Sequence, residues 1–527
     1  MKRFKANHIG VLLAVTLWLT LAYSFSLFET LQSYRIATFT QIKLIVFVAC
    51  VYGLTLTLAR LFNLFKPVAI VLMLIAAPSA YFMQQYGVLI DPDMLINALE
   101  TDPEEASDQL STGLLLFTLL MGLLPAALLA TIQISKAGAL TRLKQGGIAA
   151  LCFLVLAMGT VVTSYDDFAS LFRNHRDVKY RITPFNVISA SVSVAKQHLA
   201  QPQRFISVGQ DAFREISAKE KPHVMVVIVG ETARADHFSV NGYERPTTTR
   251  LEGLAKEGQV GSFKNATSCG TATAISVPCM FSFYSADNYS PTARNTTNVL
   301  DVLKSVGVDV TWFENNSGCK NVCDRVTTIN LSNEECESGS CFDDVLAKKL
   351  AQWLPHINSD SVIVLHQMGS HGPAYFERSP RDAKQFLPEC TSAELTDCSR
   401  QQIINAYDNS LVVTDTLVAD VISLLERNPD LDSSVMYLSD HGESLGDNGI
   451  YLHGLPKWLA PAEQTHVPWV VWPKTRFKFD DFETASVSHD NLSHTLLGYF
   501  DVKTELYEGQ LDLTLKQPKD RYASIAP

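Results

Sequence analysis

The stretch HVMVVIVGE, residues 223–231, is an unbroken run of apolar, mostly β-branched side chains that closes on a glycine and a glutamate. Such a run predicts a strand buried on both faces of a parallel sheet. Two further runs have the same form: SVIVLHQMGSHG spans Ser361–Gly372 and SVMYLSDHGES spans Ser434–Ser444. Helical patterns lie between them, at Val299–Val306 and Gln401–Glu426. Alternating strands and helices predict an α/β domain, with helices on both faces of a parallel sheet.

Polar residues of the metal-binding kind close all three runs. Glu231 ends the first, Asp440 and His441 end the third, and His371 follows the second. Ligands in such folds bind beyond the carboxyl ends of the strands, which meet at one edge of the sheet. Carboxylate and imidazole groups together suit zinc. Singly, a strand-end glutamate is a cap or an ion-pair partner and an Asp-His pair is a turn. Their coincidence at equivalent strand ends favours a metal site.

A hydroxyl nucleophile is expected in SCGTATAISVPC, residues 268–279. Gly270 precedes Thr271, where we expect a helix to begin, and the amides at a helix N-terminus favour a phosphate group. Taken alone, Thr271 is a helix N-cap. A bound metal ion would lower the pKa of its hydroxyl and supply an alkoxide-like attacking oxygen. With the metal residues present, the sequence favours Thr271 as the nucleophile.

Long apolar stretches are confined to the N-terminal third of the chain. Five are long enough to cross a hydrocarbon core of about 30 Å as helices. The first could instead be a signal peptide, since basic residues precede it, but no clear small-residue cleavage site follows, which favours an uncleaved helix. The stretches lie near Ile9–Leu27, Ile42–Leu61, Val68–Gln84, Leu114–Ile134 and Gly147–Thr163.

The charges between these stretches predict their orientation, because basic residues gather on the cytoplasmic side. On one side lie Lys2, Arg3, Lys5, Arg60, Lys66, Lys136, Arg142 and Lys144, whereas Arg35 and Lys43 lie on the other. The N-terminus is therefore expected in the cytoplasm. Five spans then place everything after Ser164 beyond the inner membrane of a bacterium, in the periplasm.

The cysteines give an independent indication of that compartment. The chain has 10 cysteines. Two, Cys50 and Cys152, fall inside predicted spans. The others form close neighbours, which predicts local disulfides in an oxidising compartment. A zinc ribbon built from the middle four is the alternative, although its spacings are wider than the usual knuckle. The four pairs are Cys269 with Cys279, Cys319 with Cys323, Cys336 with Cys341, and Cys390 with Cys398.

These patterns divide the chain into three parts. We expect a five-helix membrane domain over residues 1–163, a connector with amphipathic helices such as Phe185–Leu199 over 164–221, and a catalytic domain over 222–527. The formal net charge is -11, with no basic cluster, which argues against nucleic acid as a partner.

Three segments carry a family resemblance. SCGTATAISVPCMFS, SHGP and SDHGESLGDNGIYLHGLP resemble signature segments of the phosphoethanolamine transferases that modify lipid A, including plasmid-borne colistin-resistance enzymes. The resemblance covers essentially the whole chain, including the connector segment SLFRNHRDVKY. It implies an alkaline-phosphatase-like catalytic domain behind a five-helix membrane domain. It also implies transfer of phosphoethanolamine from phosphatidylethanolamine to lipid A, which lowers negative surface charge and gives polymyxin resistance. Relatives often have glutamate where this chain has Asp447.

The resemblance implies a zinc site and a covalent intermediate. Zinc would be held by Glu231, Thr271, Asp440 and His441. Thr271 would accept the phosphoethanolamine group as a phospho-threonine and release diacylglycerol, and the acceptor's phosphate would then attack it.

Further positions match residues that handle the transferred group in the family. His371 and His453 would bind the phosphoryl group, carry protons or hold a second zinc ion. Ser317 and Lys320, in NNSGCK, would contact that group, and a positive charge there would balance charge developing on phosphorus. The ordinary alternative for Lys320 is a solvated loop lysine.

In NALETDPEE, Asn97, Thr101 and Glu105 recur every four residues and so share one face of a helix. That face is either the solvated side of an interfacial helix or, as the resemblance implies, the recognition surface for the ethanolamine ammonium group.

Two other functions remain open from the sequence. The chain could be another member of the alkaline-phosphatase superfamily, acting on core sugars, glucans or simple phosphoesters. It could also be a membrane sensor that binds zinc or phosphate, although no signalling region lies on the cytoplasmic side. We expect a monomer.

Overall fold

The computed structural model describes residues 5–101, 106, 109–134, 138–199, 205–214, 221–331, 342–479 and 481–515. The chain divides into two compact units. The N-terminal unit comprises Met1–Leu95 and Leu110–His198, and the C-terminal unit comprises Ile96–Gln109 and Leu199–Pro527. The segment with the predicted polar face therefore groups with the C-terminal unit.

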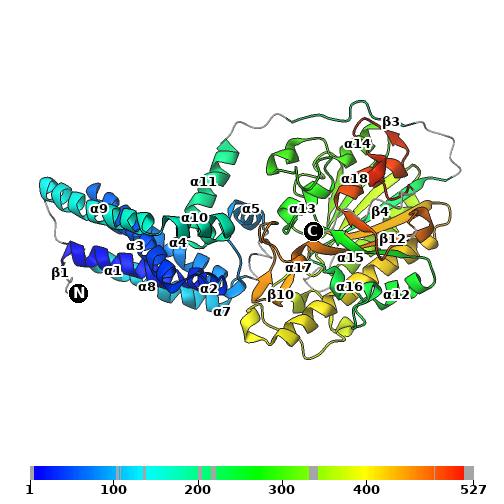
Figure 1. Cartoon of the computed structure of the whole chain (residues 1–527). Helices are drawn as coiled ribbons and strands as arrows, with labels where there is room; N and C mark the ends of the chain where they lie inside the picture. Colours follow the sequence, from blue (N-terminus) through cyan, green and yellow to red (C-terminus); the bar gives the residue numbers. More distant parts are fainter. Residues whose placement is uncertain are drawn as a thin grey trace. The chain divides into compact units, whose positions relative to one another are not determined.

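The N-terminal unit is helical (Figure 1). Among its described residues, four helices are long and apolar enough to cross a membrane, and α1 with α2 makes a fifth if this pair, bent by 49°, is one span. The first predicted span is thus broken rather than straight. A short parallel pair, β1 (Lys5–Ala6) with β2 (Gln133–Ile134), joins the segment before α1 to the segment after α8. The helices are α1 (His8–Ala22), α2 (Phe25–Ser33), α3 (Thr38–Leu61), α4 (Phe65–Tyr86), α7 (Thr112–Phe117) continued by η1 (Thr118–Leu123) and α8 (Leu124–Thr131), α9 (Ala139–Val162), α10 (Tyr165–Asn174) and α11 (Phe185–Leu199).

Exposed apolar side chains on these helices fit a lipid environment. On α9, Leu151, Leu154 and Val155 are all exposed. A soluble surface rarely exposes such a continuous apolar band, whereas a membrane-spanning helix needs one.

An eight-stranded sheet organises the C-terminal unit, in the order β13-β5-β12-β9-β4-β8-β6-β7. The central strand β4 forms because Val224–Val229 are all buried, as the opening run predicts. The small antiparallel pairs β10 (Ser444–Asp447) with β11 (Ile450–Leu452) and β14 (Val502–Lys503) with β3 (Phe213–Arg214) lie outside this sheet. The strands of the large sheet are β4 (His223–Gly230), β5 (Gly261–Thr267), β6 (Asp309–Glu314), β7 (Thr327–Asn330), β8 (Ser361–His366), β9 (Asp432–Ser439), β12 (His466–Trp472) and β13 (Ser486–Ser488).

The sheet is mixed rather than wholly parallel, which corrects the expectation from the sequence. The three predicted strands are parallel neighbours, with β4 between β8 and β9. Strand β12 runs antiparallel to both β9 and β5. An apolar run carries no direction, so the sequence pattern could not show this reversal.

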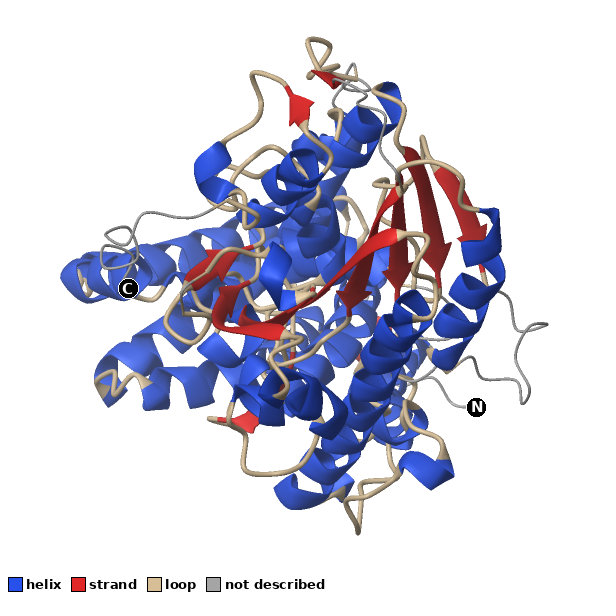
Figure 2. Ribbon diagram, turned by 90° about the vertical axis from the view of Figure 1, so that its right-hand side faces the viewer, coloured by secondary structure: helices blue, strands red, loops and turns tan. Residues whose placement is uncertain are grey.

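Helices cover both faces of the sheet, as predicted (Figures 1 and 2). Met225, Val227 and Val229 pack with side chains of α13 (Thr273–Met280), α14 (Val299–Ser305) and α18 (Asp490–Tyr499) in one hydrophobic core. Figure 1 shows α12 (Thr249–Lys256), α15 (Asp344–Trp353) and α16 (Arg400–Glu426) on the other side. Helices α14 and α16 confirm the helical patterns found in the sequence.

Three of the four predicted disulfides are formed: Cys269–Cys279, Cys319–Cys323 and Cys390–Cys398. The zinc ribbon is excluded, because two of its four cysteines are bonded to each other. The fourth predicted pair, Cys336 with Cys341, lies outside the described residues.

Candidate metal centre and nucleophile

Three side chains meet at the carboxyl ends of β4 and β9. Gly230 and Ser439 are register partners on these neighbouring strands, so the residues that follow them, Glu231 and Asp440, emerge side by side. With His441 they form a fully buried group whose ligand atoms all lie within 4.8 Å of one another. The strand ends therefore bring together three of the four metal ligands predicted from the sequence, without Thr271.

The hydrogen bonds of His441 leave one ring nitrogen facing the two carboxylates. Its Nδ1 donates to the carbonyl of Gly442 at 2.9 Å. In that tautomer Nε2 carries a lone pair, and it lies 3.3 Å from both Glu231 Oε1 and Asp440 Oδ2. Three electron-rich atoms this close repel one another unless a cation or a proton lies between them.

The two carboxylate oxygens of Asp440 differ in their hydrogen bonding. Its Oδ1 accepts from the backbone amides of Thr232, at 3.2 Å, and His441, at 2.7 Å. Its Oδ2 is buried and has no hydrogen-bond partner among the described residues. A buried carboxylate oxygen without a donor is costly, and a metal ion would satisfy it. The donor set of two carboxylates and one imidazole fits zinc.

The electrostatics of the cluster agree with this interpretation. Burial acts to raise the pKa of Glu231, but the nearby imidazoles of His441, His371 and His453 outweigh it and the pKa is lowered. Burial and the carboxylate of Glu231 raise the pKa of Asp440. One carboxylate is thus stabilised as an anion at the expense of its neighbour, as expected where two carboxylates are buried side by side.

Thr273 has a hydroxyl that lies close to both Glu231 and His441. Its Oγ1 donates to Glu231 Oε2 at 3.1 Å and lies 3.4 Å from His441 Nε2. The hydroxyl of Thr271, the nucleophile favoured by the sequence, donates instead to the carbonyl of Leu455 at 2.5 Å. Helix α13 begins at Thr273, two residues later than expected. The geometry therefore points to Thr273 in the role that the sequence assigned to Thr271.

Hydrogen bonds fix the segment that carries both threonines to the end of β9, where Asp440 lies. His489 is buried, accepts from the amide of Cys269 at 3.1 Å and donates through Nε2 to the carbonyl of Ser439 at 2.9 Å. Ser276 donates to the carbonyl of Asp440 at 2.5 Å. Sequence reasoning missed these three hydrogen bonds, because no local motif marks partners that lie 50 to 220 residues apart.

Asn316 is a further missed residue. Its Nδ2 donates to Glu231 Oε2 at 3.0 Å and to the carbonyl of Gln367 at 2.8 Å. It lies in the NNSGCK segment, in which the sequence analysis named Ser317 and Lys320 but not Asn316. An amide that holds a ligand carboxylate from behind fixes the orientation of that ligand.

His371 and His453 lie beside the cluster, as predicted. The His453 ring is 4.3 Å from the His441 ring and 5.5 Å from the His371 ring, centre to centre. His453 Nδ1 is 2.9 Å from Glu443 Oε2, and Tyr375 donates to Glu443 Oε1 at 2.9 Å. Burial raises the pKa of Glu443 to about 8. The sequence did not assign Glu443, although it directly follows the DHG turn.

The remaining predicted residues form a second group. Lys320 Nζ donates to Ser317 Oγ at 3.1 Å and to the carbonyl of Glu100 at 3.1 Å. Thr101 donates to the carbonyl of Asn97 at 2.9 Å, at the end of α5 (Pro92–Glu100). Glu105 lies outside the described residues.

Asp447, the departure from the family pattern, lies outside the metal group. It pairs with Arg234 at 2.8 Å and with Arg400 at 2.6 Å. These two ion pairs hold the loop after β9 in place.

Comparison with protein families gives two matches. Residues 46–199 match the family described as Phosphoethanolamine transferase EptA/EptB, and residues 223–502 match Sulfatase. The second match confirms the predicted alkaline-phosphatase-like architecture.

Individual relatives match over nearly the full length. The chain is 36% identical to phosphoethanolamine transferase EptA of Escherichia coli K12, over 97% of each protein. It is 37% identical to phosphatidylethanolamine transferase Mcr-1 of Escherichia coli, over 93% of this chain and 94% of that one. Among solved structures, the integral membrane lipooligosaccharide phosphoethanolamine transferase A of Neisseria meningitidis is 31% identical with a TM-score of 0.90, covering 98% of this chain and 100% of that chain.

Proposed function

The chain belongs to the phosphoethanolamine transferase family, and on that premise we propose that it moves phosphoethanolamine from phosphatidylethanolamine to a phosphate of lipid A, through a phospho-threonine at Thr273. The observation that carries this proposal is the contact of the Thr273 hydroxyl with Glu231 and His441 at the buried cluster. The relatives named EptA and Mcr-1 support the transferred group.

We propose that Glu231, Asp440, His441 and the Thr273 oxygen hold one zinc ion. When bound, zinc would lower the pKa of the Thr273 hydroxyl and offset negative charge on the reacting phosphate. The unpartnered Asp440 Oδ2 and the lone pair of His441 Nε2 support this ligand set. Asn316 would keep Glu231 in place.

In the first half-reaction, Thr273 Oγ1 forms a bond to phosphorus as the bond from phosphorus to the glyceride oxygen breaks. The hydroxyl proton has an acceptor in contact, because Thr273 already donates to Glu231 Oε2. The departing glyceride oxygen needs a proton, and His371 or His453 would supply it to give diacylglycerol. Glu443 fixes the orientation of the His453 ring through its contact with Nδ1 at 2.9 Å.

In the second half-reaction, an oxygen of the acceptor phosphate attacks the phosphorus held on Thr273. The bond to Thr273 Oγ1 breaks, and Glu231 returns the proton to that oxygen. The acceptor phosphate gives its own proton to the histidine that lost one in the first half-reaction, and the phosphoethanolamine group leaves on the acceptor. We propose that Ser317 and Lys320 contact the transferred group, and that Asn97, Thr101 and Glu105 recognise its ammonium end.

The cellular setting is part of the proposal. The basic residues counted between the spans and the three formed disulfides support an N-terminus in the cytoplasm and a C-terminal unit in the periplasm. Modified lipid A would carry less negative charge, so cationic polymyxins would bind it less well.

The test uses bacterial cells that lack their own transferase and express the full chain. We expect the mass spectrum of their lipid A to gain phosphoethanolamine on a phosphate and the cells to survive higher polymyxin concentrations. A Thr273→Ala chain, expressed at the same level, should give neither change. Unmodified lipid A with phosphoethanolamine found on core sugars would overturn the acceptor, and no modification of any envelope component would overturn the function.

A further inference from the structure

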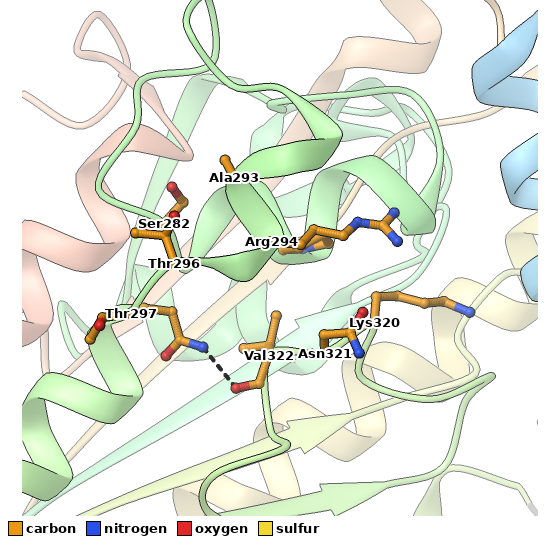
Figure 3. A pocket seen from close by; sticks show the side chains of 10 residues that line it. Ser282, Ala293, Arg294, Thr296, Thr297, Lys320, Asn321 and Val322 are labelled. Carbon is orange, nitrogen blue, oxygen red and sulfur yellow. Dashed lines mark hydrogen bonds between the residues drawn. The ribbon is translucent and has the colours of Figure 1, made fainter. Parts of the chain in front are cut away.

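A small pocket lies beside the C-terminal end of α13. Its lining includes Pro278, Ser282, Arg294, Thr296, Asn298 and Lys320. Figure 3 shows the long side chains of Arg294 and Lys320 extending toward the same side of it, from η5 (Pro291–Asn295) and from the loop after β6. Two cationic groups from separate segments thus share one pocket.

Glu100 is the acidic group found with these cations. Its Oε1 pairs with Arg294 Nη1 at 2.6 Å, and its backbone carbonyl accepts from Lys320 Nζ at 3.1 Å. The side chains of Arg294 and Glu100 are 11% and 32% exposed. Among these three residues the charges sum to one net positive charge in a poorly solvated place, which favours a further anion.

The pocket also holds polar atoms that its own residues do not satisfy. Arg294 Nε and Thr296 Oγ1 are buried and have no hydrogen-bond partner within the described part of the chain. Thr296 is only 7% exposed and lines the pocket. A guanidinium N–H and a hydroxyl without acceptors suit the oxygens of a phosphate group, which accepts several hydrogen bonds at once.

The pocket adjoins the proposed nucleophile. The Arg294 guanidinium also donates to the carbonyl of Ala274, the residue directly after Thr273. Arg294 therefore joins the pocket to the segment that carries Thr273.

We propose that Arg294 and Thr296, together with Lys320, form a phosphate-binding subsite in which the carboxylate of Glu100 takes the place of the phosphate until substrate binds. The inference rests on the proposed function for the identity of the phosphate, which belongs either to the donor headgroup or to the acceptor. In both cases the oxygens of a phosphate replace Glu100 Oε1 on the Arg294 guanidinium. Glu100 is thus a competitor for Arg294, not a structural partner that substrate needs.

Opposite effects of two substitutions test this subsite. The assay follows diacylglycerol release and lipid A modification by the purified full chain in mixed micelles, with donor and acceptor varied separately. Arg294→Gln removes the guanidinium and should raise KM for one substrate by about 10-fold or more, as expected for a lost charge-assisted hydrogen bond. Glu100→Gln removes the competing charge and should lower that same KM. The matched control is Arg250→Gln on α12, which removes an exposed arginine that pairs with Asp420 of α16.

The substrate whose KM changes identifies the source of the phosphate. Equal losses of activity in Arg294→Gln and Glu100→Gln would show a structural ion pair and overturn the subsite, as would unchanged KM values in both. A second readout does not need turnover: inorganic phosphate should raise the thermal transition of the wild-type chain more than that of Arg294→Gln. If wild type neither releases diacylglycerol nor modifies lipid A, the proposed function fails, and the phosphate-induced shift still decides the subsite.

Discussion

Replacing Thr273 and Thr271 separately by valine distinguishes the nucleophile from its neighbour. Valine keeps the volume and branching of threonine and removes only the hydroxyl, so the loop should keep its shape. At Thr271 the loss is one hydrogen bond to the Leu455 carbonyl, worth about 1 kcal/mol. If all of that cost fell on the transition state, transfer would slow by less than about 10-fold.

At Thr273 the loss is the reacting oxygen itself. Transfer should fall on the order of 10⁴-fold or more, because the attacking group is lost. Among the described residues, the one other hydroxyl that donates to Glu231 is that of Thr232. Thr273→Ser should keep a substantial share of the activity.

The assay measures the initial rate of diacylglycerol release by the purified chain, and intact-protein mass spectrometry detects the covalent adduct. Thermal unfolding shows that each variant is folded. An active Thr273→Val chain beside a dead, folded Thr271→Val chain would refute the geometric assignment and restore the one made from the sequence.

Three other perturbations have defined outcomes. Glu231→Gln should weaken zinc binding at least about 100-fold, measured by competition with a chelator, and unchanged affinity would remove Glu231 from the ligand set. Gly442→Ala should destabilise the chain by about 1–3 kcal/mol and lower its zinc content, because the new Cβ would lie 2.1 Å from the Glu463 carbonyl oxygen. Gly253→Ala, with nothing within 4 Å, should be neutral or stabilising in the same thermal and metal assays. Burial lowers the pKa of His489 to about 3, so the unfolded chain binds a proton below about pH 6.5 that the folded chain does not. Between these values wild-type stability should fall by up to about 1.4 kcal/mol for each pH unit of acidification, and His489→Gln should lessen the drop in thermal transition between pH 7.5 and 5.5; equal drops would contradict this.

The buried cluster of Glu231, Asp440 and His441 could be predicted because a strand-end position needs only local information. The apolar run before Glu231 and the one before Asp440 each mark where a strand stops, and parallel neighbours end at one edge. The pattern needed no knowledge of the connections between them.

The choice between two threonines could not be made in that way. Ala272, between them, has extended dihedral angles (φ -150°, ψ 143°), and the helix starts only after it. A shift of two residues in a loop reading CGTAT leaves composition and spacing almost unchanged, while tertiary contacts decide which hydroxyl reaches Glu231.

Contacts between distant segments could not be predicted from the sequence for the same reason. The bend between α1 and α2, the reversed strand β12 and the pocket around Arg294 all depend on packing rather than on a local signal. Arg294 in particular stands in a polar stretch, SPTARNTTN, that carries no motif.

The imidazole of His489 limits how the catalytic centre can be recombined. Because one ring joins the Cys269 amide to the Ser439 carbonyl, a third region of the chain braces the threonine segment against the strand end that supplies Asp440. A chimera that takes only the threonine segment from a relative keeps His489 but changes the segment that His489 bonds. Hybrid enzymes built from two members of the family should therefore keep all three regions from one parent, or inherit a nucleophile and a metal site that no longer line up.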